Sequence, residues 1–314
     1  MHLIRDPFRE TDLPRDCVST IGNFDGIHVG HQKIIENVVR LAKESHSPAV
    51  VITFDPHPLA VIAPDRVPPR ILTLGQKAEI LESMGIDALV VVPFTPTLSR
   101  MSAADFVKEL FIDALAVRHL FAGRDFHFGA GRLGDLQLLK SMGDQGGFTV
   151  TAVDDVTVRG IRVSSSIVRD AIRKGSVSVV RLALDRDYFI DGTVETGRRL
   201  GRKIGVPTVN LDPDNELYPE TGVFVTSCSF ETFGRAFPSV TNIGVRPTLY
   251  ENYARTIESH VLDFSSNVYG DRVRLTFHRL LRRERQFTSA LELASQIQRD
   301  IQRARTYFDE RPSI

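Results

Sequence analysis

The sequence predicts two domains of different fold class: an α/β domain built on a doubly wound parallel sheet, and a small antiparallel β-barrel with a C-terminal helix. The first observation is length, because 314 residues exceed the ~250–300 at which a single hydrophobic core stops growing. The second is a change near residue 185, where alternating strand-like and helix-like segments give way to short β-branched strands. We therefore expect domains at residues 1–184 and 185–314.

Buried strands and amphipathic helices alternate through the first half. The apolar runs at 49–54 and 88–92 are typical of strands buried on both faces, and shorter strands are expected at 18–21 and 117–122. Because parallel neighbours need helical crossovers, this order predicts a parallel sheet with helices on both faces. The helices are expected at 34–42, 76–84 and 103–115.

Gly, Pro and Asn separate the shorter strands of the second half. Strands are expected at 222–226, 255–262 and 272–277, and this spacing predicts an antiparallel barrel or sandwich. A polar amphipathic helix is expected at 289–308. Its candidate core contacts are Leu291, Leu293, Ile297 and Ile301.

The composition argues against several classes of protein. Lys+Arg and Asp+Glu both number 39, so the basic surplus of a nucleic-acid binder is absent and no nucleic-acid partner is expected. No run of ~18 apolar residues predicts a membrane span, and residues 1–10 are too polar for a signal peptide. Two cysteines, Cys17 and Cys228, make neither a disulfide framework nor a zinc cluster. We expect a cytoplasmic location.

A glycine-rich segment with two histidines stands where the first strand meets the first helix. Residues 22–31 read Gly-Asn-Phe-Asp-Gly-Ile-His-Val-Gly-His. A helix N-terminus at the carboxyl end of a parallel strand attracts phosphate, and His28 and His31 are spaced so that both rings can point the same way. Two imidazoles suit charge that develops on phosphate oxygens. By spacing alone, a surface pair or a partial metal site is equally expected.

Two further segments carry residues suited to phosphate. Residues 163–169, Val-Ser-Ser-Ser-Ile-Val-Arg, put hydroxyls at a helix start, where they either cap the helix or clamp a phosphate together with Arg169. Residues 197–210, Gly-Arg-Arg-Leu-Gly-Arg-Lys-Ile-Gly-Val-Pro-Thr-Val-Asn, are not a P-loop. In a strand, Thr208 and Asn210 would face one way and offer oxygen ligands to Mg²⁺. The alternative is a solvated basic hairpin loop.

Taken together, these segments resemble the bacterial bifunctional riboflavin kinase/FAD synthetase family, whose N-terminal module is a Rossmann-like nucleotidyltransferase with a His-x-Gly-His signature. The resemblance covers essentially the whole chain in the family's order. Ser166 stands where the family usually has threonine, and Val206 and Val209 replace Phe and Ala. The other matching stretches are Phe-Asp-Pro-His-Pro at 54–58, Gly-Arg-Asp-Phe-His-Phe-Gly at 123–129, Thr-Asn-Ile-Gly-Val-Arg-Pro-Thr at 241–248, Ile-Glu-Ser-His-Val-Leu-Asp-Phe at 257–264 and Tyr-Gly at 269–270.

For the N-terminal domain, the resemblance implies adenylylation of FMN by ATP to give FAD and pyrophosphate. His28, His31 and Arg169 are then the catalytic candidates. Asp55 and His57 could line the same sheet edge, although capping roles suit them equally well. The implied nucleotide-binding residues are Gly22, Asn23, Phe24, Asp25, Gly30, Ser164 and Ser165, and the flavin-binding residues are Asp125, Phe126 and Phe128.

For the C-terminal domain, the resemblance implies phosphorylation of riboflavin to FMN, with ATP as co-substrate and Mg²⁺ as cofactor. Glu258 is the candidate base that accepts the proton of the flavin's ribityl hydroxyl, although a surface ion pair with Arg255 is the plainer interpretation. His260 shares its strand face. The implied nucleotide-binding residues are Gly201, Lys203, Gly205 and Pro207, and the metal ligands are Thr208 and Asn210.

One departure from the family and two rival functions stay open. The family usually carries Leu-Gly-Arg-Pro-Tyr at the domain junction, whereas residues 184–188 read Leu-Asp-Arg-Asp-Tyr, which predicts a junction that is helical for longer. One rival function is an FMN adenylyltransferase whose barrel binds flavin without catalysis. The other is a non-catalytic flavin-binding regulator or RNA-binding protein, which the neutral charge disfavours. An oligomer is possible, but its size does not follow from the sequence.

Overall fold

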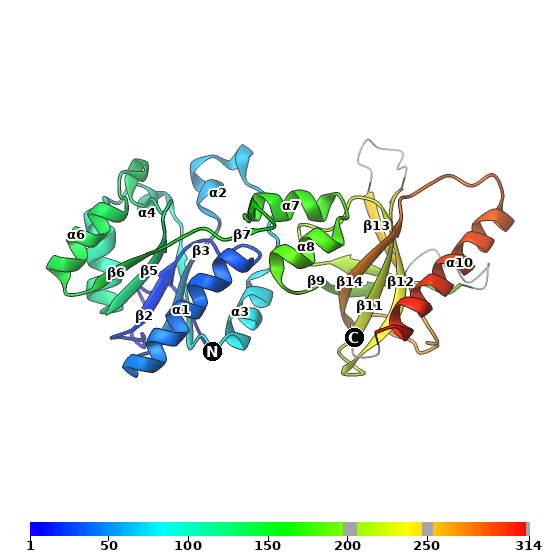
Figure 1. The fold of residues 1–314 in the computed structure, drawn as a ribbon, viewed down its shortest axis with the longest axis horizontal. Coiled ribbons are helices and arrows are strands. Elements are labelled where there is room, and N and C mark those ends of the chain that lie inside the picture. The colour runs from blue at the N-terminus through cyan, green and yellow to red at the C-terminus, as the bar shows by residue number, and fades with distance from the viewer. Residues whose placement is uncertain (197–205, 247–253, 312–314) are drawn as a thin grey trace. The chain divides into compact units, whose positions relative to one another are not determined.

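The computed structural model describes residues 1–196, 206–246 and 254–311, which divide into two compact units. The first unit is Met1–Ser164 and the second is Ser165–Ile314. Figure 1 shows the α/β unit in blue to green and the barrel unit in green to red. Within the described residues, no helix has both the length and the apolar character needed to cross a membrane.

A six-stranded sheet, parallel throughout, forms the centre of the first unit (Figure 1). Its spatial order is β1-β4-β3-β2-β5-β6. The strands at 18–21, 49–54, 88–92 and 117–122 were all predicted, and the structure confirms them within two residues. The strands are β1 (His2–Arg5), β2 (Val18–Ile21), β3 (Ala49–Asp55), β4 (Ala88–Pro93), β5 (His119–Gly123) and β6 (Thr149–Val153).

Helices cover both faces of this sheet, as the doubly wound prediction requires. Val50 and Ile52 of β3 pack in one cluster with Leu110 and Phe111, whereas Val51 between them is buried on the opposite face. The helices are α1 (Val29–Ser45), α2 (Pro58–Ile62), η1 (Pro64–Arg66), α3 (Leu74–Ser83), α4 (Pro96–Ser99), α5 (Ala103–Phe106), η2 (Val107–Ala114), η3 (Ala130–Arg132) and α6 (Leu136–Gly146), and β7 (Thr157–Val158) pairs with β8 (Ile161–Arg162) in a small hairpin.

Two features of this unit differ from the sequence prediction. The helix expected at 103–115 is present, but after Phe106 it continues as a π-helix, η2, in which Leu115 donates to the carbonyl of Leu110 five residues earlier. The edge strands β1 and β6 were not predicted. Both are short, and their partly exposed side chains break the continuous apolar pattern of a central strand.

The sheet order places a ligand-binding edge between β2 and β5. From β2 the chain proceeds to β3 and β4 on one side, whereas β5 and β6 lie on the other. In open α/β sheets, ligands bind at such a switch point, outside the carboxyl ends of the strands. The Gly22–His31 segment follows β2, and the segment after Gly123 follows β5, so both predicted motifs meet at this edge.

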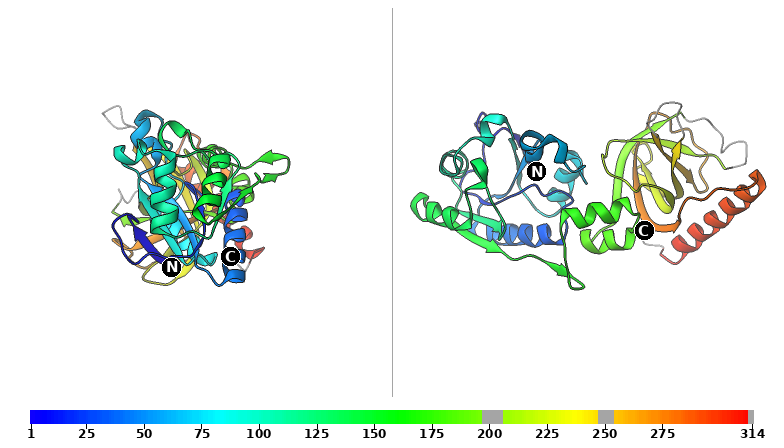
Figure 2. Two further views of the ribbon diagram at one scale, coloured as in Figure 1. Left: turned by 90° about the vertical axis from the view of Figure 1, so that its left-hand side faces the viewer. Right: turned by 90° about the horizontal axis from the view of Figure 1, so that it is seen from above.

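A closed, six-stranded antiparallel barrel forms the second unit, in the order β10-β13-β12-β11-β14-β9. Helix α10 lies along the outside of the barrel (Figures 1 and 2), where Ile301, Ala304 and Tyr307 pack on Val225. The elements are α7 (Ser165–Arg173), α8 (Val177–Leu184), β9 (Tyr188–Glu195), β10 (Val209–Pro213), β11 (Gly222–Phe230), β12 (Arg235–Arg246), β13 (Ala254–Val261), β14 (Arg272–Arg282) and α10 (Ala290–Asp309).

The compact units divide earlier in the chain than the domains we expect. Helix α8 contacts β9 and β14, so α7 and α8 belong to the barrel unit, which begins at Ser165. The domain boundary that we expect between residues 184 and 185 stays a prediction.

The junction departs from the family's sequence but keeps a sharp helix end. Helix α8 ends at Leu184, and Asp185 is its C-cap with φ 52°, a left-handed conformation that usually selects glycine. The longer helix that we expected is therefore not found. Asp187 accepts hydrogen bonds from Arg181 Nε at 2.5 Å, Arg181 Nη2 at 2.6 Å and His278 Nδ1 at 2.8 Å. This carboxylate ties the end of α8 to β14.

Replacing Asp187 with asparagine is expected to lower the free energy of unfolding by about 1–3 kcal/mol at neutral pH, because Arg181 and His278 lose a charged acceptor. Burial raises the pKa of Asp187, but hydrogen bonds from His278 and Arg181 lower it more. The pKa of Asp187 is therefore below its ordinary value. The carboxylate's contribution is therefore complete at neutral pH and is lost as pH falls below about 4. Urea unfolding at pH 7 and at about pH 3.5 measures both effects.

The matched control for this substitution is Asp214→Asn. Asp214 pairs with Arg272 at the surface, with both side chains more than 40% exposed. Such exposed pairs contribute little to stability, so this variant should unfold like the wild type. Equal unfolding of Asp187→Asn and Asp214→Asn would contradict the role of the junction carboxylate.

Candidate functional site

The loop after β2 is a tight turn that depends on two glycines. Gly26 has φ 87°, and a Cβ there would lie 2.9 Å from Ile71 Cδ1. Gly30, on the first turn of α1, leaves room for the His28 ring, because a Cβ there would lie 3.1 Å from His28 Cε1 and Nδ1. Phe24 and Ile27 also adopt positive φ, which costs energy for non-glycine residues and often occurs at functional sites. The turn therefore presents the start of α1 in one fixed shape.

His28 and His31 lie against each other at this helix start. Their rings stack with centroids 3.7 Å apart and planes 17° apart. His31 Nδ1 is buried and has no hydrogen-bond partner among the described residues, a state usually explained by a missing ligand or water. Burial, His28 and Lys77 hold the pKa of His31 well below its ordinary value. The structure thus brings both predicted histidines together, with a neutral imidazole at His31.

Phe24 and Asp25 lie beneath the loop, whereas Gly22 and Asn23 lie at its surface. Phe24 is 1% exposed and packs edge-on against His31. Asp25 is 6% exposed, and its carboxylate accepts from the backbone N–H groups of Ile71 and Leu72. Both side chains support the loop, so contact of these two residues with a nucleotide would use their backbone and stays a prediction.

An aromatic cavity of about 760 Å³ opens beside this loop, at the carboxyl ends of β2, β3 and β5. All three predicted flavin-binding residues, Asp125, Phe126 and Phe128, line it together with Gly22 and Asn23. Its volume is typical of small-molecule sites, and its apolar walls suit a flat ring system. The other aromatic lining residues are Phe54, Phe94 and Phe106.

His57 connects the cavity to the loop. Its Nδ1 accepts from the N–H of Leu59 and caps α2, as one of our two interpretations predicted, while its Nε2 lies 3.2 Å from Asn23 Nδ2. Asp125 lies at the exposed rim, where its Oδ2 is 2.5 Å from Arg162 Nη2. Asn23, His57 and Asp125 are therefore polar groups among the aromatic residues that line the cavity.

The serine-arginine motif lies at the start of α7. Ser164 immediately precedes the helix, Ser165 begins it, and Arg169 is on its next turn with 8% exposure. This is the helix start that the sequence predicted. Because α7 belongs to the second unit, the proposed contact of these residues with a triphosphate in the first unit stays a prediction.

A row of polar residues crosses four strands of the barrel. Asn210 on β10 is directly opposite Glu258 on β13, and Glu258 is directly opposite Asn242 on β12. Glu195 on β9 is opposite Asn210 on its other side. Residues opposite each other in an antiparallel pair share a face, so these side chains project from the same side of the barrel wall. The neighbouring Ser259, by contrast, joins a buried network of hydroxyls.

Thr208 lies immediately before β10, two residues from Asn210 in the chain. Pro207 is tied to β13, because its carbonyl accepts from His260 Nδ1 at 2.8 Å. The structure therefore pairs Asn210 with Glu258, whereas the contribution of the Thr208 side chain to the same site stays a prediction. Gly201, Lys203 and Gly205 lie outside the described residues.

The oxygen donors of this row fit a magnesium ion. Thr208 offers a hydroxyl and Asn210 an amide carbonyl, which are oxygen ligands of the kind that Mg²⁺ prefers. In the described part of the chain, no group of three or more His, Cys, Asp or Glu side chains could hold a metal ion. A magnesium ion held by Thr208 and Asn210 would need further ligands from substrate phosphates and water.

Two residues of these sites were not predicted as site residues. Asn242 lies within residues 241–248, a stretch that we compared with the family. Because side chains alternate along a strand, Asn242 is on the other face of the barrel wall from the inward-facing Thr241. Lys77 belongs to α3 and reaches the loop after β2 from a segment 54 residues away in sequence. No local motif indicates such a long-range contact.

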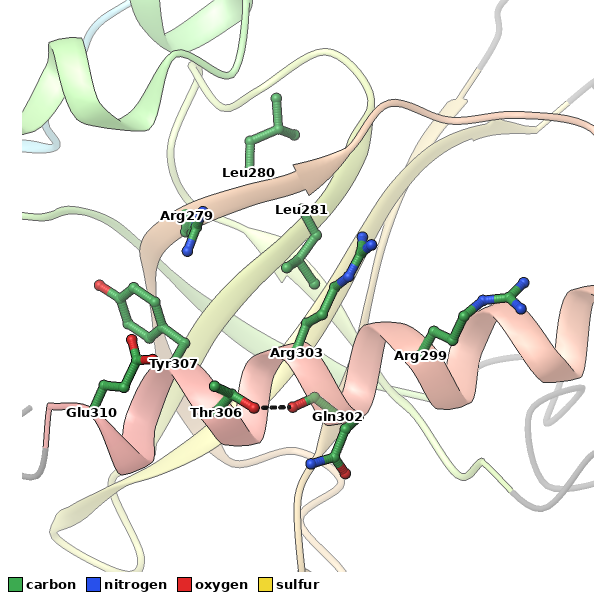
Figure 3. Close-up of a pocket in the computed structure, with 9 residues that line it drawn as sticks. All are labelled: Arg279, Leu280, Leu281, Arg299, Gln302, Arg303, Thr306, Tyr307 and Glu310. Atoms are coloured by element: carbon green, nitrogen blue, oxygen red, sulfur yellow. Dashed lines mark hydrogen bonds between the residues drawn. The ribbon is translucent and has the colours of Figure 1, made fainter.

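A second cavity, of about 490 Å³, lies between β14 and α10 (Figure 3). Figure 3 shows Arg303 rising from α10 toward Leu281, with Arg279 and Arg299 on either side. Among the described residues, none that the sequence predicted for either site lines this cavity.

The fold and the two residue sets define a two-domain transferase that acts on nucleotides and their phosphates. Residues 10–167 match the family model described as FAD synthetase, and residues 184–308 match the model described as riboflavin kinase. The chain belongs to the family of bifunctional riboflavin kinase/FMN adenylyltransferases. This confirms the resemblance that the motifs indicated.

Relatives with this name align along nearly their whole length. The Pseudomonas fluorescens protein is 38% identical over 97% of each chain, and the Escherichia coli K12 protein is 35% identical over 98% of each. The Bacillus subtilis protein is 35% identical over 93% of this chain and 92% of its own. A Streptococcus pneumoniae crystal structure titled a macrolide-efflux protein has a TM-score of 0.88 at 27% identity and covers 97% of this chain and 99% of its own.

Proposed function

We propose that the chain makes FMN and FAD in turn, with the barrel row as the riboflavin kinase site and the loop after β2 as the FMN adenylyltransferase site. The observation that carries this proposal is the presence of both family domains in one chain. The stacked rings of His28 and His31 and the pairing of Asn210 with Glu258 support it. The chain uses ATP in both reactions.

In the kinase reaction, Glu258 accepts the proton of the riboflavin 5′-hydroxyl as its oxygen attacks the γ-phosphorus of ATP. The products are FMN and ADP. Asn210 and Asn242, on either side of Glu258, hold the carboxylate in position. Mg²⁺ held by Thr208 and Asn210 would neutralise phosphate charge. Phosphoryl transfer depends mainly on alignment and charge neutralisation, so one base in a fixed strand is sufficient.

In the adenylyltransferase reaction, the FMN phosphate attacks the α-phosphorus of ATP and pyrophosphate leaves. The aromatic cavity holds the flavin ring, which directs the FMN phosphate toward Gly22 and the start of α1. His28 and His31 donate hydrogen bonds to the phosphate oxygens whose charge rises in the transition state. Ser164, Ser165 and Arg169 hold the triphosphate of ATP.

A single assay tests the proposal. The protein is incubated with riboflavin, ATP and Mg²⁺, and the flavins are separated by chromatography. We expect FMN to appear first and FAD to follow. FAD from added FMN without any product from riboflavin would instead support an adenylyltransferase with a non-catalytic barrel. The cytoplasmic location and the lack of a nucleic-acid partner stay predictions.

A further inference from the structure

Lys77 is a buried lysine beneath the loop that carries the two histidines. It lies in the first turns of α3, whose start is fixed by a capping box between Thr73 and Gln76. Its exposure is 8%. A buried cation is costly unless its surroundings compensate for the loss of water, so its partners indicate what it does.

The ammonium group of Lys77 binds the loop directly. Nζ donates to the backbone carbonyl of Asn23 at 2.8 Å and to Thr53 Oγ1 at 3.2 Å, and the Thr53 hydroxyl donates to the same carbonyl at 3.2 Å. One carbonyl is thus held by both α3 and β3. Because Asn23 is also tied to His57, this contact fixes the point where the loop meets the aromatic cavity.

Charged groups surround Lys77 from several elements. Asp25 of the loop and Asp55 at the end of β3 favour its charged form, whereas Arg70 before α3 opposes it. Burial lowers the pKa of Lys77 to about 8. The positive charge in turn helps to lower the pKa of His31. The hydrogen bonds of Lys77 go to neutral oxygens, whereas its charge interacts with Asp25 and Asp55.

We propose that Lys77 is a positioning residue for adenylyl transfer: its ammonium group holds the carbonyl of Asn23 and places a positive charge beside the histidine pair. The inference rests on the proposed FMN adenylyltransferase function. Because the turn is held in this way, it fixes the positions of His28 and His31 relative to the flavin cavity. The charge favours an anionic triphosphate above the loop and keeps His31 neutral, so that its ring nitrogen stays a neutral donor.

The test is Lys77→Met, with Lys33→Met as the matched control. Methionine fills a similar space without a charge, and the Thr53 hydroxyl still donates to the Asn23 carbonyl, so this carbonyl keeps one of its two donors. Lys33 is an exposed lysine on the adjacent helix α1. We expect Lys77→Met to lower kcat for FAD formation from FMN by about 10²-fold, because a small misplacement of catalytic groups has effects of this size. Lys33→Met should match the wild type.

A pH profile separates the charge from a merely structural contact. A neutral amine can still donate both hydrogen bonds, so a structural lysine would leave no titration in the rate. If FAD formation requires the positive charge of Lys77, the wild-type rate should fall as pH rises through about 8, the pKa of Lys77. This alkaline limb should be absent in Lys77→Met. Riboflavin phosphorylation, measured in the same preparations, should show the same profile in all three proteins.

Each outcome decides the inference. Equal FAD formation in Lys77→Met and wild type, or superimposable pH profiles, would overturn it. If the wild type forms no FAD, the proposed function itself fails, which is a different result. Unchanged riboflavin phosphorylation and an unchanged thermal unfolding temperature in Lys77→Met exclude misfolding as the cause of any loss.

Discussion

Glu258→Gln is expected to reduce FMN formation from riboflavin by roughly 10²–10⁴-fold, the usual contribution of a general base. Glutamine keeps the shape of glutamate but cannot accept the proton of the attacking hydroxyl. Glu258 lies between Asn210 and Asn242, so the substitution should leave the strand pairing intact. Steady-state assays with riboflavin and ATP measure the loss.

FAD formation by the same variant serves as a control for the loss of kinase activity. FAD formation from added FMN should continue at the wild-type rate, because the adenylyltransferase loop belongs to the other compact unit. Glu231→Gln, at an exposed position of the barrel's β11–β12 turn, should retain both activities. A Glu258→Gln enzyme that phosphorylates riboflavin at full rate would show that this carboxylate is not the base.

The sequence predicted the fold class because each domain has a simple apolar pattern. Continuous apolar runs identified the central strands β3 and β4, which are buried on both faces. Edge strands lack such runs, so β1 and β6 were missed. Asp185 shows a different limit. The sequence shows aspartate where the family has glycine, but only the backbone shows that Asp185 adopts the left-handed conformation and ends the helix.

The candidate sites were predicted as far as they are local in sequence. His28 and His31 are three residues apart on one helix start, so their meeting follows from helix geometry. The pairing of Asn210 with Glu258 joins strands 48 residues apart, and the resemblance indicated both residues without indicating their register. Lys77 was missed because its partner, the Asn23 carbonyl, is a backbone atom whose position only the folded loop determines.

His28→Ala is expected to lower kcat for FAD formation from FMN by roughly 10²–10³-fold, the effect of removing one hydrogen-bond donor from a preorganised oxyanion site. The reason is geometric. His28 is the N-cap residue of α1 and stacks on His31, so its ring is held at the helix end where we propose that phosphate binds. Alanine removes the ring and also the surface that orients His31.

Riboflavin phosphorylation distinguishes this local effect from a general defect. His28→Ala should form FMN from riboflavin at the wild-type rate and accumulate it, the reverse of Glu258→Gln. His2→Ala, an exposed histidine at the start of β1, should make both products normally. Normal FAD formation by His28→Ala would place the adenylyl-transfer site elsewhere in the first unit.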